Sequence, residues 1–444
     1  MSRTILLTGT PSEVGRCVGE LAGPVLRGHI QRMWDAAAAA GLGAAGLDER
    51  GERLRAFVER VAPEWLDEAE ATAAAAGVNA ADLFALNALP RGFWEAERGG
   101  CTSCLVVGSQ SATGSTLLHK NRDLLNAPQD FHLRRLADGA QVLASRDIGN
   151  LGFGHFHSDR ALAGANNTGS CIAADEIRDC GISDCHLLRL VAERAASCDE
   201  AVALLEDAIA REVAGGSGAS RGMIFLFAEP AKGVLVEMTS RRLAVREVRD
   251  ETLVRTNHFL LDAMRPVASE PPTQNSLRRF ARAQEILDPL ETKNLADLQR
   301  MARDHNDGPD SICSSDREHL WMTVSACTHV VRADNADPRA HTRALIGNPR
   351  NTLAIPIPRA IDGLPEECVD CSLHDLSREL YARFGVGDHL ADVREEYERP
   401  IAAEFGTIGA AVQSYEPGLQ RRYLTALVAR SVERVRATLE GLLE

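Results

Sequence analysis

Aromatic side chains are scarce in this chain of 444 residues, where Phe, Tyr and Trp together make up 5%. Long apolar runs are missing as well, and no stretch approaches the roughly 20 residues that a transmembrane helix needs. The first apolar run, at residues 5–7, is followed by polar, Gly and Pro residues and is too short for the core of a signal peptide. From these absences we expect a cytoplasmic protein without a membrane partner.

Blocks of positive charge are also missing. The formal net charge is −14, and the arginines are mixed with acidic residues along the chain. This pattern argues against a nucleic-acid partner. Apolar residues at 45% and charged residues at 25% are close to the globular average, so we expect a compact fold of one large domain with attachments or two to three smaller domains.

The eleven cysteines form an odd, scattered set that argues against a disulfide framework, and we expect most of them to be small buried side chains. Two Cys-x-x-Cys pairs, Cys101 with Cys104 and Cys368 with Cys371, could supply four thiolates to a zinc ion. The pairs are far apart in the sequence, and within a strand Cys101 and Cys104 would point to opposite faces. We therefore expect no metal at these pairs.

Two histidines, His155 and His157, alternate along a strand or loop and could form a ligand pair. No acid or cysteine follows at metal spacing nearby in the sequence. We interpret both as surface or pocket-lining side chains.

The pattern of apolar residues divides the chain into three parts. Residues 1 to about 98 read as helices after a short strand at 4–7, with Ser12 as the N-cap of the first helix, a helix at 63–77 that ends at a glycine, and another at 80–89. From residue 101 an antiparallel hairpin and further strands are predicted, at 101–123, 141–145, 170–174, 222–228, 233–238, 243–248, 252–256 and 320–331. Helices are predicted at 183–213, broken near 197–199, and at 276–287, so the order indicates a layered α+β sandwich.

After a Pro-rich boundary at residues 355–358, helical periodicity continues to the end of the chain. The last helix carries one apolar stripe, which docks either on the main domain or on a second copy. Its members are Leu424, Val428, Val432, Val435, Leu439 and Leu442.

The sharpest local feature is the run Arg98-Gly-Gly-Cys-Thr, where a helical region stops and Cys101 opens a strand. A bend at Gly99 and Gly100 can bring the sulfur of Cys101 over the carbonyl of Gly100, as an N-to-S acyl shift requires. Hydrolysis of the resulting ester would free an α-amino group of pKa about 7.7–8.0 beside a thiol of pKa near about 8.5. The amine could then act as general base for its own thiol. The alternative is a buried structural cysteine.

The junction Gly100-Cys101-Thr102 resembles the processing site of the acyl-coenzyme A:6-aminopenicillanic acid acyltransferases and their bacterial relatives, peptidase family C45, which are N-terminal nucleophile (Ntn) hydrolases. The resemblance covers most of residues 1–350, through segments at 64–89, 114–124, 164–170, 254–260, 276–287 and 311–313. It implies a four-layer αββα sandwich of two antiparallel sheets. Residues 1–100 would be a helical segment, 101–358 the catalytic core and 359–444 a helical extension.

By this resemblance Cys101 matches the nucleophile, Asp123 the acid that holds the N-terminal amine, and Asn257 the amide that stabilises the oxyanion. Asp123 could instead cap backbone amides at the end of the hairpin, and Asn257 could bond a strand end. Arg122 could orient a substrate carboxylate or be a surface strand residue.

The chain also departs from the family. Thr239 stands where the penicillin enzyme has a serine near its acyl pocket, and the asparagines expected around residues 173–175 are replaced, with Asp175 among the replacements. We predict Arg122, Asp175 and Thr239 as substrate-binding residues. These differences, with the tail after residue 358, argue against a penicillin substrate.

The sequence thus predicts a self-processing cysteine amidohydrolase or acyltransferase that cleaves or forms amide bonds through an acyl-thioester on Cys101. We expect no cofactor, although a coenzyme A thioester could be the acyl donor, and a small amide or acyl-thioester as substrate. The two processed chains would stay associated, and a homo-oligomer could form. The alternatives are a hydrolase without transferase activity, a catalytically silent binding or scaffold protein with the same fold, and a cysteine-rich metal-binding protein.

Overall fold

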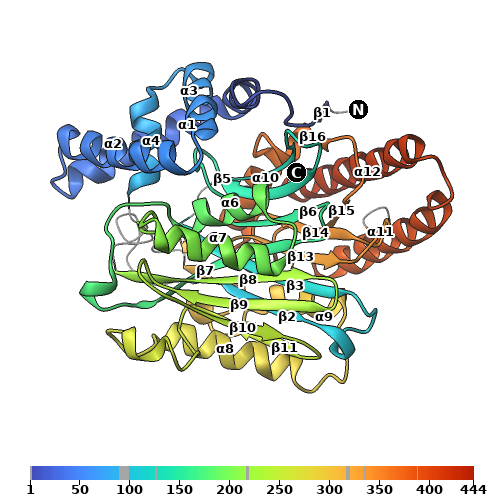
Figure 1. Ribbon diagram of the computed structural model, residues 1–444. Helices are drawn as coiled ribbons and strands as arrows, with labels where there is room; N and C mark the ends of the chain where they lie inside the picture. Colours follow the sequence, from blue (N-terminus) through green and yellow to red (C-terminus); the bar gives the residue numbers. More distant parts are fainter. Residues whose placement is uncertain are drawn as a thin grey trace.

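The structure is a computed structural model that describes residues 3–89, 100–125, 128–216, 220–316, 321–334, 337–387 and 389–444. Two large antiparallel sheets form its centre, and helices lie at both ends of the chain (Figure 1). The predicted α+β class with two antiparallel sheets is confirmed. Among the described residues, no helix combines the length and the apolar character needed to cross a membrane.

The first sheet has the strand order β10-β9-β8-β7-β6-β5-β4. Its strands are β4 (Gln129–Arg135), β5 (Gln141–Asp147), β6 (His155–Ser158), β7 (Ala163–Cys171), β8 (Arg221–Glu229), β9 (Lys232–Met238) and β10 (Leu243–Val248). Helices α6 (Asp184–Arg194) and α7 (Cys198–Ala210) pack on one face of this sheet, where Phe225 and Phe227 share a core with Leu187 and Leu205. The predicted break between these helices is confirmed, because Ser197 is the N-cap of α7.

The second sheet has the order β11-β2-β3-β13-β14-β15, with β12 also paired to β13. Its strands are β2 (Thr102–Val106), β3 (Thr116–Leu125), β11 (Thr252–Arg255), β12 (Ser315–Asp316), β13 (Trp321–Val331), β14 (His341–Ile346) and β15 (Ile355–Pro358). Helices α8 (Gln274–Leu287) and α9 (Leu295–Ala302) contact its outer face. The predicted hairpin of β2 and β3 is confirmed.

The two sheets face each other across an apolar core. Leu105 and Leu118 of the second sheet share this core with Ala165 and Leu226 of the first. On the other face of β2, Cys104 packs with residues of α8 and α9. Strand β2 is therefore buried on both faces, and every one of its residues is buried.

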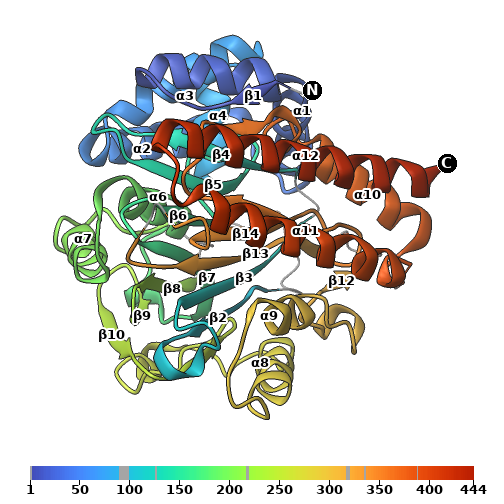
Figure 2. The ribbon, with the colours of Figure 1, turned by 90° about the vertical axis from the view of Figure 1, so that its right-hand side faces the viewer.

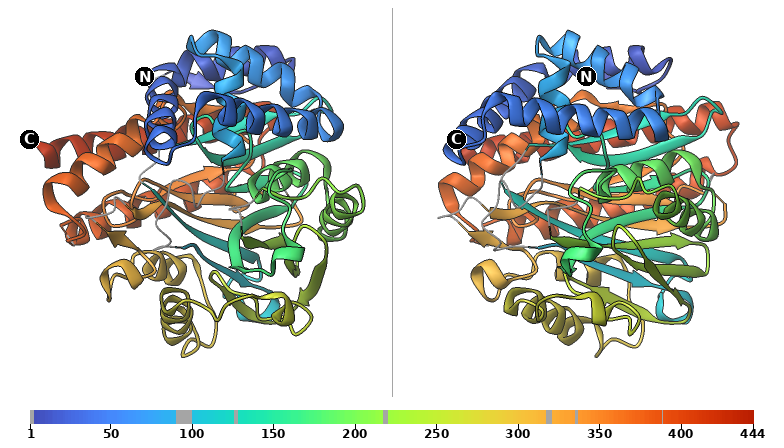
Figure 3. Two further views of the ribbon diagram at one scale, coloured as in Figure 1. Left: turned by 90° about the vertical axis from the view of Figure 1, so that its left-hand side faces the viewer. Right: turned by 60° about the vertical axis from the view of Figure 1, so that its left-hand side comes forward.

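The N-terminal helices cap the molecule at the end opposite to α8 (Figure 3). The elements are β1 (Thr4–Ile5), α1 (Pro11–Ala39), α2 (Ala44–Val61), α3 (Glu64–Ala76) and α4 (Ala80–Ala88). The N-cap of α1 is Thr10, so the prediction of Ser12 is wrong: Thr10 and Glu13 form a capping box, and Pro11 occupies the first helical turn. Gly77 ends α3 in the left-handed conformation, as its position predicts.

The C-terminal segment packs on the body of the molecule and is visible across the front of Figure 2. It contains β16 (Leu364–Pro365), α10 (Ser372–Phe384), α11 (Ala391–Val412) and α12 (Pro417–Leu443). Val428 and Val432 of the apolar stripe share a core with Ile355 of β15, so this stripe docks on the main body. The Pro-rich boundary is itself an edge strand, a place where proline is tolerated.

Candidate active site

Three predicted site residues lie at one end of the second sheet. Cys101 directly precedes β2, Asp123 is near the C-terminal end of β3, and Asn257 lies two residues beyond β11. Strand β2 pairs antiparallel with both β3 and β11, so its first residues meet the last residues of its two neighbours. The hairpin and its partner strand therefore bring the three positions to the same edge.

Gly100 packs directly against this edge. A Cβ atom at residue 100 would overlap the side-chain oxygen of Asn257 and would lie 2.8 Å from Nη2 of Arg279. Space, therefore, requires a glycine here. The predicted bend also involves Gly99, which lies outside the described residues, so the bend stays a prediction.

Arg279 of α8 joins the predicted residues to one another. Its Nη1 donates to the carbonyl of Cys101 at 2.7 Å and to Oγ1 of Thr102 at 3.1 Å, while Nη2 donates to Oδ1 of Asn257 at 2.8 Å. Asn275, one helical turn earlier, accepts from the same guanidinium at 3.0 and 2.8 Å. This fully buried cation fixes the backbone of Cys101 and the orientation of the Asn257 amide.

Asp123 is buried beside this arginine. Burial raises the pKa of Asp123 to about 6, and the nearby Arg279 cation, a hydrogen bond from Thr323 and the backbone amide of Gly100 limit the rise. The Thr323 hydroxyl donates to Oδ1 of Asp123 at 2.7 Å, and the two residues face each other in the register of β3 and β13. The carboxyl can therefore exchange a proton near neutral pH, as a general base must.

The Asn257 side chain is held at both ends. Its oxygen accepts from Arg279, which leaves the amide nitrogen as the donor, and this nitrogen donates to the carbonyl of Thr168 on β7 at 2.8 Å. The backbone amide of Asn257 donates to Oγ of Ser276 at 2.9 Å. An amide nitrogen carries two protons, so one is left over from the bond to Thr168.

Cys101 lies close to the same arginine, which donates to its carbonyl. Burial lowers the pKa of Arg279, and the negative charges available on Asp123 and Cys101 both act to raise it. Cys101 is only 4% exposed. The thiol, the carboxyl and the guanidinium therefore form one buried group.

Arg122 is directed elsewhere. Its guanidinium forms a two-pronged ion pair with Asp147, at 2.7 and 2.8 Å, and also donates to Gln129. The side chain is 2% exposed. The guanidinium of Arg122 was predicted to bind a substrate carboxylate. In the structure it is paired with the carboxylate of Asp147 instead.

Asp175 and Thr239 lie in neighbouring turns at the end of the first sheet. Asp175 is exposed in the turn of residues 174–176 that follows β7. Thr239 is buried and its hydroxyl donates to Glu176 at 2.7 Å. No contact joins either residue to Cys101 among the described hydrogen bonds, and their role in substrate binding stays a prediction.

A separate cluster between the sheets has the side chains to bind a metal. Ligand atoms of His155, Cys327 and His329 all lie within 4.8 Å of one another, and all three residues are buried. The interpretation of His155 and His157 as surface or pocket-lining residues is therefore wrong, because β6 lies inside its sheet and directs both rings inward. Among the described residues, the two Cys-x-x-Cys pairs form no such group.

Part of the chain matches a known protein family. A family model described as acyl-coenzyme A:6-aminopenicillanic acid acyl-transferase matches residues 167–332. The predicted family resemblance is confirmed. The part matched to this acyl-transferase family contains Asn257 and Arg279 and begins after Cys101 and Asp123. The description of this family model names an acyl-transferase activity.

Several solved structures are similar to the chain at low identity. Two variants of the conjugated bile acid hydrolase from Clostridium perfringens each have 12% identity, with TM-scores of 0.41 and 0.39, covering 58% and 55% of this chain and 92% and 89% of theirs. The Caenorhabditis elegans ortholog of N-acylethanolamine-hydrolyzing acid amidase has 14% identity and a TM-score of 0.34, covering 52% and 92%. No curated protein matches the chain significantly.

Sequence reasoning did not single out Arg279 or Thr323. Arg279 lies in the 276–287 segment that carries part of the resemblance, but its contacts with residues 101 and 102 span more than 170 positions. Thr323 reaches Asp123 across 200 positions. One sequence pattern could have indicated Arg279. It lies on the buried face of an amphipathic helix, in line with the apolar residues Ala283 and Leu287, where an arginine is unusual.

Proposed function

We propose that the chain is a self-processing Ntn-type cysteine enzyme with the four-layer αββα core of that class. It cuts itself between Gly100 and Cys101 and then cleaves or forms amide bonds through an acyl-thioester on Cys101. The observation that supports this most strongly is the single buried arginine, Arg279, that contacts both the carbonyl of Cys101 and the side chain of Asn257. Asp123 lies beside the same arginine.

Self-processing begins with the thiol of Cys101. Its sulfur attacks the carbonyl carbon of Gly100, the C–N bond to Cys101 breaks, and the thiol proton passes by way of Asp123 to the departing nitrogen. The Asn257 amide donates to the carbonyl oxygen as negative charge develops on it, a contribution typically of about 3–4 kcal/mol to the barrier. Water then hydrolyses the thioester, giving the carboxyl group of Gly100 and the free amine and thiol of Cys101.

Turnover repeats this chemistry on an external acyl group. The Cys101 amine accepts the thiol proton, the sulfur attacks the substrate carbonyl, and the protonated amine delivers the proton to the leaving group. Water or an amine then releases the acyl group. A small amide or an acyl-thioester, including a coenzyme A thioester, fits this scheme, and it uses no metal or organic cofactor. The substrate contacts of Asp175 and Thr239 remain part of the proposal, and Arg122 would join them only where its pair with Asp147 opens.

Intact mass is the direct test. The purified wild-type chain should give two fragments that meet between Gly100 and Cys101, and the larger fragment should gain the mass of an acyl group after exposure to a reactive acyl-thioester. A single uncut wild-type chain that takes up no acyl group would refute the proposal.

A Gly100→Ala substitution should slow self-processing by about 100-fold. The added methyl group would overlap Asn257, and a displacement of about 1 Å at a reacting centre costs a factor of this size. The rate of fragment formation after purification of uncut chain, followed by mass spectrometry, measures the effect. Gly418→Ala is the matched control, since a Cβ there meets nothing within 4 Å and processing should be unchanged.

Self-processing should also depend on pH through Asp123. With a pKa of about 6, the carboxyl is mostly protonated below pH 6 and mostly ionised above it, so the rate should rise with a midpoint near that pH. Asp123→Asn should remove this step from the pH profile and lower the rate at pH 7 by about 100-fold or more. A profile with the same midpoint in the variant would contradict the assignment.

The same residue should show the opposite effect on stability. The pKa of Asp123 is raised in the folded chain above its usual 3.8, so the ionised carboxylate destabilises the fold as pH rises from about 4 to about 6. In a chain that cannot cut itself, Asp123→Asn should therefore increase the free energy of unfolding at pH 7 by about 2–3 kcal/mol. Urea unfolding at pH 4 and pH 7 measures this, and the gain should shrink at the lower pH.

A further inference from the structure

The cluster of His155, Cys327 and His329 lies between the two sheets and is separate from the residues around Cys101. His155 comes from β6 of the first sheet, while Cys327 and His329 come from one face of β13 in the second. All three side chains are at most 1% exposed. Side chains that are far apart in the sequence and come from two sheets thus converge on one buried point.

Two distances within the cluster are close to those between ligands of one ion. Sγ of Cys327 lies 3.3 Å from Nε2 of His329, and this nitrogen lies 3.1 Å from Nδ1 of His155. Bonds of about 2.0–2.1 Å to nitrogen and about 2.3 Å to sulfur at a tetrahedral angle place two nitrogens about 3.3 Å apart and nitrogen and sulfur about 3.6 Å apart. Outward movements of about 0.2–0.3 Å would make room for the ion.

Hydrogen bonding within the cluster leaves two neighbours on one nitrogen of His329. Nδ1 of His329 is 2.8 Å from Oγ1 of Thr342, so a ring that donates there has a single lone pair on Nε2. Two neighbours, Cys327 and His155, compete for that lone pair. A bound ion would use the lone pairs of both rings and the sulfur at once.

We propose that His155, Cys327 and His329 bind one thiophilic d10 metal ion, Cu⁺ or Zn²⁺. One thiolate and two imidazoles suit these ions, and the three donors include no carboxylate of the kind that Mg²⁺ and Ca²⁺ prefer. The ion links β6 to β13 and so fastens one sheet to the other. Binding displaces the thiol proton of Cys327 to solvent, and no electron is transferred.

Thr342 is the positioning residue of this site. Its hydroxyl lies 2.8 Å from Nδ1 of His329 and 3.3 Å from Nδ1 of His157, so it holds the His329 ring with Nε2 toward the other two donors. Metal-binding histidines are commonly fixed in this way, and loss of the contact costs about 10- to 100-fold in affinity. Thr342→Val should weaken metal binding by that factor.

Metal retention tests the proposal directly. The chain is stripped with a chelator and offered one equivalent of Zn²⁺, of Co²⁺ as its coloured substitute, or of Cu⁺ under anaerobic reducing conditions, and bound metal is measured after gel filtration. Wild type should retain one Zn²⁺ or one Cu⁺ ion per chain. Bound Co²⁺ should show thiolate-to-metal charge-transfer absorption. Cys327→Ser and His329→Gln should each lower the affinity by at least about 100-fold.

Two variants serve as controls. Cys104→Ser changes another buried cysteine, which packs on the helix side of β2, and should leave metal binding unchanged. Cys101→Ala should also bind metal normally, which separates this site from the proposed nucleophile. No retention of either d10 ion by wild type, or equal retention by Cys327→Ser, would overturn the proposal. If the Cys327 and His329 variants do not fold, the cobalt absorption of Cys101→Ala decides: its presence supports the site and its absence overturns it.

Discussion

A Cys101→Ala variant is expected to remain one uncut chain and to form no acyl adduct. The methyl group of alanine has no lone pair to attack the Gly100 carbonyl, and removal of a catalytic nucleophile lowers rates by a factor on the order of 10⁶. The buried position of Cys101 accommodates the smaller side chain, so the fold should persist. Intact mass and labelling with an acyl-thioester, both compared with wild type, measure the loss.

Two other substitutions make this result specific. Cys104→Ala removes a thiol three residues away that faces the apolar core with α8 and α9, so it should lower stability and leave processing intact. Cys101→Ser keeps a weaker nucleophile at the same place and should retain slow processing. Full activity in Cys101→Ala, or activity in a chain whose bond between Gly100 and Cys101 is intact, would refute the proposed function.

Local signals in the sequence predict much of the fold. The Gly77 helix end, the break before α7 and the hairpin of β2 and β3 each depend on residues close in sequence, and each is confirmed. Strand β7 was predicted at 170–174 but runs over Ala163–Cys171. Its polar residues Asn166 and Asn167 lack the apolar alternation that marks a strand.

The reason for these polar residues appears only in the tertiary structure. Asn166 donates to Asp184 at 2.7 Å, and Asn167 accepts from Ser103 and Lys120, both at 2.7 Å. Buried amides need such partners, and here they come from other elements of the fold. A single sequence does not identify those partners.

Some residues of the candidate site could likewise be predicted from the local sequence, and others only from the tertiary structure. Glycine before a cysteine at the start of a strand is a local pattern, so Gly100 and Cys101 could be singled out from the sequence. The contact of Arg279 with the Cys101 carbonyl depends on how α8 lies against β2. The convergence of His155 with Cys327 and His329 likewise depends on the stacking of two sheets.

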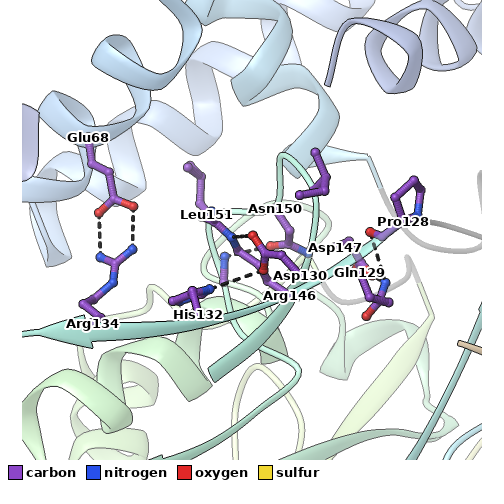
Figure 4. Close-up of polar contacts among 12 residues, drawn as sticks. Glu68, Pro128, Gln129, Asp130, His132, Arg134, Arg146, Asp147, Asn150 and Leu151 are labelled. Atoms are coloured by element: carbon purple, nitrogen blue, oxygen red, sulfur yellow. Dashed lines mark hydrogen bonds and ion pairs between the residues drawn. The ribbon is translucent and has the colours of Figure 1, made fainter. Parts of the chain in front are cut away.

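The proposed cut leaves residues 1–100 bound to the rest only by noncovalent contacts. A buried group of charges is central to this interface (Figure 4). Glu68 of α3 forms a two-pronged ion pair with Arg134 of β4, at 2.7 and 2.8 Å, and accepts from Arg189 of α6 at 2.5 Å. Glu193 receives the Trp65 ring N–H at 2.8 Å and also contacts Arg189. The N-terminal segment therefore supplies one of the two carboxylates that neutralise two buried arginines, and Glu193 supplies the other.

The pKa of Glu68 shows the strength of this coupling. Burial by itself would raise the pKa, but Arg134 and Arg189 outweigh burial and hold it well below the usual value. A carboxyl with a lowered folded pKa stabilises the fold above its unfolded pKa of about 4.3, and that contribution is lost only as pH falls toward the folded pKa. The interface should therefore hold at neutral pH and weaken in strong acid.

A Glu68→Gln substitution should release the N-terminal chain from the processed protein. It leaves two buried arginines with only Glu193 to neutralise them, and breaking a buried ion pair in this way costs about 3–5 kcal/mol. A loss of that size weakens association by about 100-fold or more. Size-exclusion chromatography of the cut protein measures the release, and urea unfolding of the uncut Cys101→Ala chain measures the loss of stability.

Glu70→Gln on the same helix is the matched control. Its ion pair with Arg55 is exposed and lies within residues 1–100, so the substitution should change stability by less than about 1 kcal/mol. Equal effects of the two substitutions would show that the buried charges do not hold the chains together.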